Sequence, residues 1–231
     1  GFDVITYKTQ RSVHFPANSY PNVLQVKIDG HLTADQASQP VVAHLPDAID
    51  PTNFTIANSC CINCEGPDFW MADFQKAFAE VGEGQLLIMS IVGTIQDGFT
   101  EDDYHEDFAR AAGLAAEAGA QVIEINLSCP NVASEGVICY TPRVVEDVCR
   151  RVRERIGQEI KLITKIAYFK PTQEKLLREV VASMGLYVDG ISAINTLAAP
   201  IVTSDGKQAF PGPGREKAGV SGSAIKWAGI E

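Results

Sequence analysis

The sequence has few of the features that mark several classes of protein. Its 231 residues include only six cysteines, and 19 Lys plus Arg residues stand against 29 Asp plus Glu, for a formal net charge of −10. Six cysteines in a chain of this length are too few for a disulfide scaffold. The deficit of basic residues argues against nucleic-acid binding, because phosphate binding needs clustered cations. Arginines cluster only at Arg150, Arg151, Arg153 and Arg155.

Long apolar runs are also lacking. No stretch approaches the roughly 18 to 20 consecutive apolar residues that a membrane-spanning helix requires. The N-terminal residues do not show the basic segment and apolar run of a signal peptide. With 45% apolar and 21% charged residues, the composition is that of a folded globular protein. The sequence therefore predicts a soluble, cytoplasmic protein with no membrane contact.

Three of the cysteines stand close together and raise the question of a metal site. Cys60, Cys61 and Cys64 could supply three thiolates to a metal ion. The sequence places no fourth ligand and no second Cys-x-x-Cys pair. We therefore expect ordinary thiols near a turn, and no metal.

The sequence does contain a repeated alternation of short apolar runs with amphipathic segments. The apolar runs are typical of buried parallel strands and cover residues 2–7, 86–91, 122–127, 160–166 and 190–195. The last four begin 36, 38 and 30 residues apart, which suits βαβ units of roughly 30 or more residues. Right-handed crossovers between parallel strands then leave two architectures, a doubly wound sheet or a (β/α) barrel.

Four amphipathic helices are predicted, and two hairpins outside the main sheet. Thr100 with Asp103 predicts a capping box for the second helix, and Pro142 and Pro171 begin the third and fourth. Asp29-Gly30 and Asp205-Gly206 predict hairpins over residues 23–32 and 201–210. The predicted buried faces are Phe69, Trp70, Phe74 and Phe78; Tyr104, Phe108, Ala111, Ala112 and Ala115; Val145, Val148, Cys149, Val152 and Ile156; and Leu176, Leu177, Val180, Val181 and Met184.

Polar residues gather where the predicted strands end, and ligands of parallel α/β proteins collect at those ends. An unpaired buried ammonium loses several kcal/mol of hydration, so Lys8 and Lys165 imply either a ligand or a carboxylate such as Glu124. Side-chain amides could bind a flat heterocycle or cap turns. The polar residues at the strand ends are Lys8, Thr9, Ser90, Asn126, Ser128, Cys129, Asn131, Lys165, Asn195 and Thr196.

These residues resemble a known family. Asn126-Leu127-Ser128-Cys129-Pro130-Asn131 after a strand, with Lys8-Thr9, Lys165 and Ile194-Asn195-Thr196 on other strands, resembles the FMN-dependent dihydroorotate dehydrogenase family and the related FMN domain of dihydropyrimidine dehydrogenase. Residues 219–226 resemble that family's glycine-bearing start of the helix after the sixth strand. The resemblance spans nearly the whole chain and implies a TIM barrel with FMN at its carboxyl-terminal mouth.

The resemblance also implies a role for each matching residue. Cys129 matches the base of the cytosolic class, which takes a proton from C5 of the substrate while C6 delivers hydride to flavin N5, and Lys8 would stabilise its thiolate. Lys8 and Lys165 would contact the flavin near its N1/O2 edge, and Ser221 with Gly222 would bind phosphate. The cofactor-binding residues implied are Lys8, Thr9, Asn126, Lys165, Ile194, Ser221 and Gly222, and the substrate-binding residues are Asn58, Asn126, Asn131, Asn195 and Thr196.

The activity implied is oxidation of (S)-dihydroorotate to orotate by an FMN oxidoreductase. Two alternatives stay open. One is a dihydropyrimidine dehydrogenase-like enzyme acting on uracil or dihydrouracil-type rings, because residues 58–63 lack the family's usual glycine and proline and Ile166-Ala167 replace its prolines. The other is a catalytically silent flavin-fold interaction module. The electron acceptor is open among fumarate, a quinone and NAD reached through a partner, and we expect either a homo-oligomer or a complex with an electron-transfer subunit.

The identifiable strands are too few for the complete fold. Five strands cannot close an eight-stranded barrel. The first, seventh and eighth strands of the family's barrel have no counterpart in this sequence. We therefore predict that residues 1–231 form a single FMN-binding TIM-barrel domain that is incomplete and belongs to a longer polypeptide.

Overall fold

The computed structural model of the protein describes residues 2–44, 50, 52–128 and 138–230. They fall into two compact units. Unit 1 comprises Gly1–Pro16 and Ile62–Ser192, and unit 2 comprises Ala17–Cys61 and Ala193–Glu231. That the chain forms a single domain stays a prediction.

Unit 1 is built on a five-stranded parallel sheet, as predicted. The sheet has the order β1-β5-β6-β7-β8, and every neighbouring pair is parallel. This mixed α/β arrangement is consistent with an incomplete TIM barrel. The strands are β1 (Val4–Gln10), β5 (Leu86–Ile91), β6 (Val122–Asn126), β7 (Lys161–Lys165) and β8 (Gly190–Ser192).

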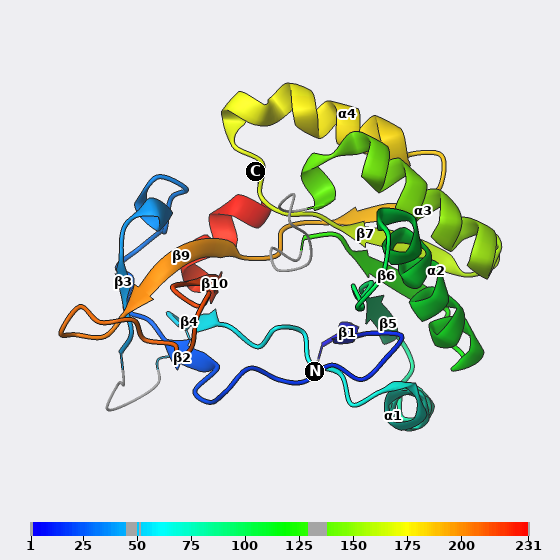
Figure 1. Cartoon of the computed structure of the whole chain (residues 1–231), viewed down its shortest axis with the longest axis horizontal. Coiled ribbons are helices and arrows are strands. Elements are labelled where there is room, and N and C mark those ends of the chain that lie inside the picture. The colour runs from blue at the N-terminus through cyan, green and yellow to red at the C-terminus, as the bar shows by residue number, and fades with distance from the viewer. Residues whose placement is uncertain (1, 45–49, 51, 129–137, 231) are drawn as a thin grey trace. The chain divides into compact units, whose positions relative to one another are not determined.

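The predicted helices of unit 1 are confirmed. α2 and α3 pack against each other, as do α3 and α4, so the three helices form one layer (Figure 1). The capping box at Thr100 forms as predicted, with Asp103 as its partner. The helices are α1 (Pro67–Ala79), α2 (Glu101–Glu117), α3 (Pro142–Ile156) and α4 (Glu174–Met184), with 3-10 turns η2 (Ile138–Tyr140) and η3 (Pro171–Gln173).

Most of the predicted side chains on the helix faces are buried, Phe78, Leu176 and Leu177 are partly buried against the core, and two are exposed. Phe69 is 60% exposed, because Trp70 and Phe74 define the buried stripe of α1 and Phe69 lies about 100° of rotation away from Trp70. Val181 is also exposed. Cys149 is fully buried, which confirms that it packs in the core.

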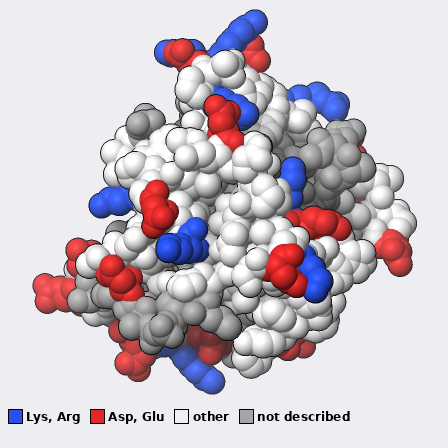
Figure 2. All heavy atoms as spheres, turned by 90° about the vertical axis from the view of Figure 1, so that its left-hand side faces the viewer, with Lys and Arg blue, Asp and Glu red and all other residues white. Residues whose placement is uncertain are grey.

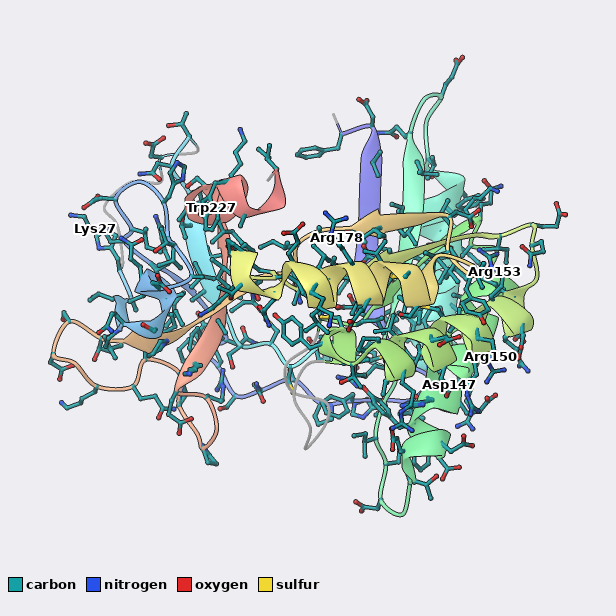
Figure 3. The ribbon with its side chains drawn as sticks, turned by 90° about the horizontal axis from the view of Figure 1, so that it is seen from above. Lys27, Asp147, Arg150, Arg153, Arg178 and Trp227 are labelled. Carbon is teal, nitrogen blue, oxygen red and sulfur yellow. The ribbon has the colours of Figure 1, made fainter. Side chains whose placement is uncertain are left out.

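The arginine cluster of α3 is occupied by carboxylates. Asp147 accepts hydrogen bonds from His105 Nδ1 at 2.8 Å, Arg151 Nε at 2.9 Å and Arg150 Nη2 at 2.7 Å. Figure 3 shows Asp147, Arg150 and Arg153 along this helix. Arg153 pairs with Asp189 at 2.7 Å. Arg150 thus pairs within α3, Arg151 also reaches Glu106 of α2 at 3.2 Å, and Arg153 holds α3 to the end of the α4–β8 connection.

Unit 2 is a second five-stranded sheet, of order β2-β4-β10-β9-β3. All its pairings are antiparallel except that of β3 with β9 (Figure 1). Its elements are β2 (Val23–Gln25), the 3-10 turn η1 (Gln36–Ser38), β3 (Val41–Val42), β4 (Thr55–Asn58), β9 (Leu197–Val202), β10 (Lys217–Gly222) and the 3-10 helix η4 (Ser223–Gly229).

One of the two predicted hairpins is present. Val202 bridges Gln208 around Gly206, which confirms the hairpin over residues 201–210. The prediction of a hairpin over residues 23–32 was wrong. β2 pairs with β4 instead, and the Asp29-Gly30 turn leads to a bridge between Val26 and Ala43. The two segments that were predicted as hairpins thus contribute strands to one sheet.

Two surface features bear on function. On the face shown in Figure 2, Lys and Arg side chains lie singly among Asp and Glu side chains. Among the described residues, none of the helices combines the length and the apolar character needed to cross a bilayer.

Candidate active site

Two predicted site residues of unit 1 lie side by side. Asn126 ends β6, Lys165 ends β7, and the two are register partners in the parallel ladder. The buried Asn126 side chain accepts hydrogen bonds at Oδ1 from Ser128 Oγ at 2.7 Å and from Ser128 N at 3.3 Å. These bonds fix the orientation of the amide. Within the described part of the chain, no acceptor faces its Nδ2 group, which can therefore donate to a ligand.

A chain of polar side chains crosses the same sheet. Thr9 Oγ1 lies 2.9 Å from Ser90 Oγ, Ser90 Oγ donates to Glu124 Oε1 at 2.8 Å, and Lys165 Nζ lies 3.5 Å from that same Oε1. Thr9, Ser90 and Glu124 are buried, and the Lys165 side chain is 19% exposed. The carboxylate partner considered for Lys165 is therefore present.

Lys8 and Thr9 lie in an irregular part of β1. The register of β1 against β5 shifts between Tyr7 and Gln10. Thr9 is buried, whereas Lys8 is exposed and its carbonyl accepts a hydrogen bond from Gln10 Nε2 at 3.1 Å. Consecutive residues of a strand point to opposite faces, so Lys8 and Thr9 meet different environments.

Unit 2 brings Asn58 and Thr196 together. Asn58 Nδ2 donates to Gly219 O at 3.3 Å, and a Cβ atom at Gly219 would lie 2.4 Å from Thr196 Oγ1. Only glycine permits this approach. Asn195 and Ile194 directly precede Thr196 and are half-buried. Four of the predicted site residues thus lie around the β9–β10 pair.

Ser221 and Gly222 directly precede a helix, as predicted, and Gly222 is the N-cap of η4. They end β10, an antiparallel strand, and the helix that follows is a 3-10 helix of seven residues. Gly222 has φ of 108°, and a Cβ there would lie 2.2 Å from Phe54 O, so close packing of β10 on β4 explains the glycine. The N–H groups of Ser223 and Ala224 already donate to Phe54 O at 3.0 Å and Thr55 Oγ1 at 3.2 Å. Phosphate binding by Ser221 and Gly222 stays a prediction.

Two predicted site residues, Cys129 and Asn131, lie outside the described residues. Among the described residues, no group of three or more His, Cys, Asp or Glu side chains could hold a metal ion. Cys60, Cys64, Cys139 and Cys149 are free thiols.

The hydrogen bond from Ser90 to Glu124 was not predicted from the sequence. The signal was a polar residue inside each of two apolar runs, Ser90 in β5 and Glu124 in β6. Because strands buried on both faces are nearly continuous apolar runs, a polar residue within one marks a partner nearby. The register supplies the pairing, since Ser90 and Glu124 are ladder partners.

A lysine and an amide at adjacent strand ends of a parallel α/β sheet stand where such proteins bind ligands, and the sheet is consistent with an incomplete TIM barrel. The family model described as dihydroorotate dehydrogenase matches residues 35–231. The chain belongs to the dihydroorotate dehydrogenase family, whose members are FMN-dependent flavoproteins.

Individual relatives are similar at low identity. The chain is 30% identical over 238 residues to a dihydroorotate dehydrogenase of Dictyostelium discoideum, covering 100% of this chain and 63% of the relative. It is 28% identical over 190 residues to the catalytic subunit of a dihydroorotate dehydrogenase B (NAD(+)) of Desulforudis audaxviator, covering 81% and 56%. It is 32% identical over 149 residues to the NAD-dependent dihydropyrimidine dehydrogenase subunit PreA of Escherichia coli K12, covering 62% and 33%. The chain thus spans 63% or less of the length of these relatives.

Proposed function

We propose that this chain forms part of an FMN-dependent oxidoreductase that oxidises (S)-dihydroorotate to orotate. The observation that carries the proposal is the pairing of Asn126 with Lys165 at the ends of β6 and β7, because Asn126 is the first residue of the hexapeptide that contains Cys129. Family membership supports it independently.

The described residues of unit 1 fit the ring of FMN. The pyrimidine edge of a flavin carries carbonyl oxygens and N1, which are acceptors, and it becomes more negative on reduction. Lys165 offers a partly exposed cation there, and Asn126 offers an amide donor with no acceptor among the described residues. Lys8, Thr9, Lys165, Asn126 and Ile194 would hold the ring, and Ser221 and Gly222 the phosphate.

The proposed chemistry divides the work between a base and binding groups. Cys129 takes the C5 proton as a thiolate, which needs a pKa below the ordinary value of about 8.5, and a cation such as Lys8 would lower it. Bound FMN would supply the acceptor at N5 for the hydride that leaves C6, so that a C5–C6 double bond forms. Asn58, Asn126, Asn131, Asn195 and Thr196 would orient the substrate ring and carboxylate. The orientation of these amides determines whether the C5 proton points at the sulfur.

A second candidate is an enzyme for uracil-type rings. One relative is named as a subunit of a dihydropyrimidine dehydrogenase. The segment from Asn58 to Cys64 also departs from the family's usual pattern, and it leads directly from a substrate-binding amide. A changed wall of the substrate pocket at this position would alter which substituent of the pyrimidine ring fits.

Assays of the FMN-loaded protein separate the two candidates. Orotate formation from (S)-dihydroorotate is measured beside uracil formation from dihydrouracil, with fumarate, a quinone and NAD as alternative acceptors. A higher kcat/KM for dihydroorotate supports the proposal, and a higher value for dihydrouracil supports the second candidate. Purified protein that shows no flavin absorbance after incubation with FMN would contradict both and favour a silent module.

We also propose a cytoplasmic location and a complex with an electron-transfer subunit or a second copy of the chain. Two of the relatives are named as subunits of larger enzymes. The test of assembly is the mass of the FMN-loaded protein in solution.

A further inference from the structure

Glu124 occupies an unusual position for a carboxylate. It lies in the middle of β6, it is 3% exposed, and its neighbours in the strand are buried apolar residues. A buried carboxylate is costly unless it is paired and hydrogen-bonded. Its side chain meets Ser90 and Lys165, one from each neighbouring strand.

Hydrogen bonds from the two strands on one side hold the Glu124 side chain. Ser90 uses its single hydroxyl hydrogen toward Glu124 Oε1. Thr9 then donates to Ser90 Oγ. The donors therefore point in sequence from β1 through β5 to β6, and Lys165 Nζ approaches the same oxygen from β7.

We propose that Glu124 is a positioning residue that acts as the counter-ion of Lys165 and so limits the positive charge presented to the flavin. The inference rests on the proposed function, because it takes Lys165 to face FMN. Ser90 and Thr9 hold the carboxylate, and the carboxylate holds the ammonium at the carboxyl end of β7. Since a nearby cation favours the reduced flavin, a counter-ion on that cation lowers the reduction potential.

The test is the midpoint potential of FMN bound to the purified protein. Glu124→Gln keeps the shape of the side chain and an oxygen for Ser90 but removes the negative charge. We expect the potential to rise by at least the equivalent of a tenfold change in the equilibrium constant, about 30 mV for a two-electron couple. Lys165→Met should lower it, because the cation is removed.

Glu154→Gln is the matched control. Like Glu124, Glu154 pairs with a basic residue, in this case Arg150. The Glu154 side chain, however, is 62% exposed on α3. This variant should leave the potential unchanged. A rise equal to that of Glu124→Gln would mean that only the net charge matters and would overturn the inference.

Removing one member of a buried ion pair can prevent folding. If Glu124→Gln does not fold, Glu124→Asp decides, because it withdraws the carboxylate by one methylene and should raise the potential by a smaller amount. An unchanged potential in the folded variant overturns the inference while the proposed function stands. Unaltered protein that binds no FMN overturns both.

Discussion

At the scale of single residues, burial separates the cysteines into reactive and inert groups. Cys139 and Cys149 have no exposed surface, and burial raises the pKa of their thiols, to about 11 for Cys139 and about 12 for Cys149. Cys60 and Cys61 are only half-buried. The thiolate is the nucleophile, so these differences set the rate of alkylation.

Iodoacetamide at pH 8 should therefore label Cys60 and Cys61 and spare Cys139 and Cys149. At that pH roughly one in a thousand Cys139 thiols is ionised. Peptide mass spectrometry after timed labelling measures each site, and labelling in urea is the control in which all four react. Equal rates at Cys61 and Cys139 in the folded protein would contradict the assigned burial.

The sequence could predict Asn126 and Lys165 as neighbours at strand ends, because apolar runs show where buried parallel strands stop. It could name Glu124 as a candidate partner of Lys165, but it could not decide between that carboxylate and a ligand. That depends on the register between β6 and β7, and parallel register is set by packing across elements and not by local sequence.

At the scale of elements, Asp189 connects a strand to a helix. Its Oδ2 accepts from Leu162 N at 2.8 Å and from Arg153 Nη2 at 2.7 Å, and Oδ1 accepts from Lys161 Nζ at 3.3 Å. The pKa of Asp189 lies below its ordinary value, chiefly because of the hydrogen bond from Leu162 N. The hydrogen bonds from Arg153 and Lys161 also lower it, whereas partial burial raises it. β7 and α3 thus share one carboxylate.

Asp189→Asn should lower the free energy of unfolding at pH 7 by about 1 kcal/mol, a value reduced for the partial exposure of the side chain. A lowered native pKa stabilises the fold above the unfolded pKa of about 3.9, and this contribution is lost as the pH falls through the native pKa. The difference between variant and unaltered protein should therefore shrink below pH 4. Urea unfolding of both proteins at pH 7 and at a pH below 4 measures this difference in the free energy of unfolding.

Asp97→Asn is the control for this prediction, because Asp97 is exposed and makes no ion pair with another described residue. It should leave stability unchanged at both pH values. A loss at Asp189→Asn that stays constant with pH would show that charge at Asp189 is not the cause.

The elements of unit 1 were predictable for a physical reason. Its strands contain short apolar runs, and its helices α1, α2 and α3 begin at Pro67, at the capping box of Thr100 and at Pro142, so these elements are marked locally. The sheet of unit 2 was not predictable, because β3 has only two residues and β2 pairs with β4 across about thirty residues of chain. Asp29-Gly30 predicts a turn, but a turn does not decide which strands pair.

At the scale of the whole molecule, the parallel sheet as described has two end strands with apolar surface. Val4 on β1 is 58% exposed and Ile191 on β8 is 43% exposed. Unpaired strand edges with apolar side chains favour association with other chains. A net charge of −10 opposes it at long range.

Ile191→Lys should reduce self-association of this 231-residue chain, because a charged residue on an end strand disfavours edge pairing. Sedimentation velocity across a range of concentrations measures the effect. Leu186→Lys adds the same charge at a site that is 87% exposed and outside the strands, and it should change association little. Equal effects of the two variants would assign the change to net charge and not to the β8 edge.

The central claim is that Cys129 removes a proton from a dihydropyrimidine while FMN accepts the hydride. The most direct test mixes FMN-loaded protein with (S)-dihydroorotate in the absence of oxygen and follows the loss of oxidised-flavin absorbance. The unaltered protein should be bleached, and Cys129→Ser should keep its FMN but be bleached much more slowly, because an alcohol is a far weaker base than a thiolate. Bleaching of Cys129→Ser at the unaltered rate would contradict the account.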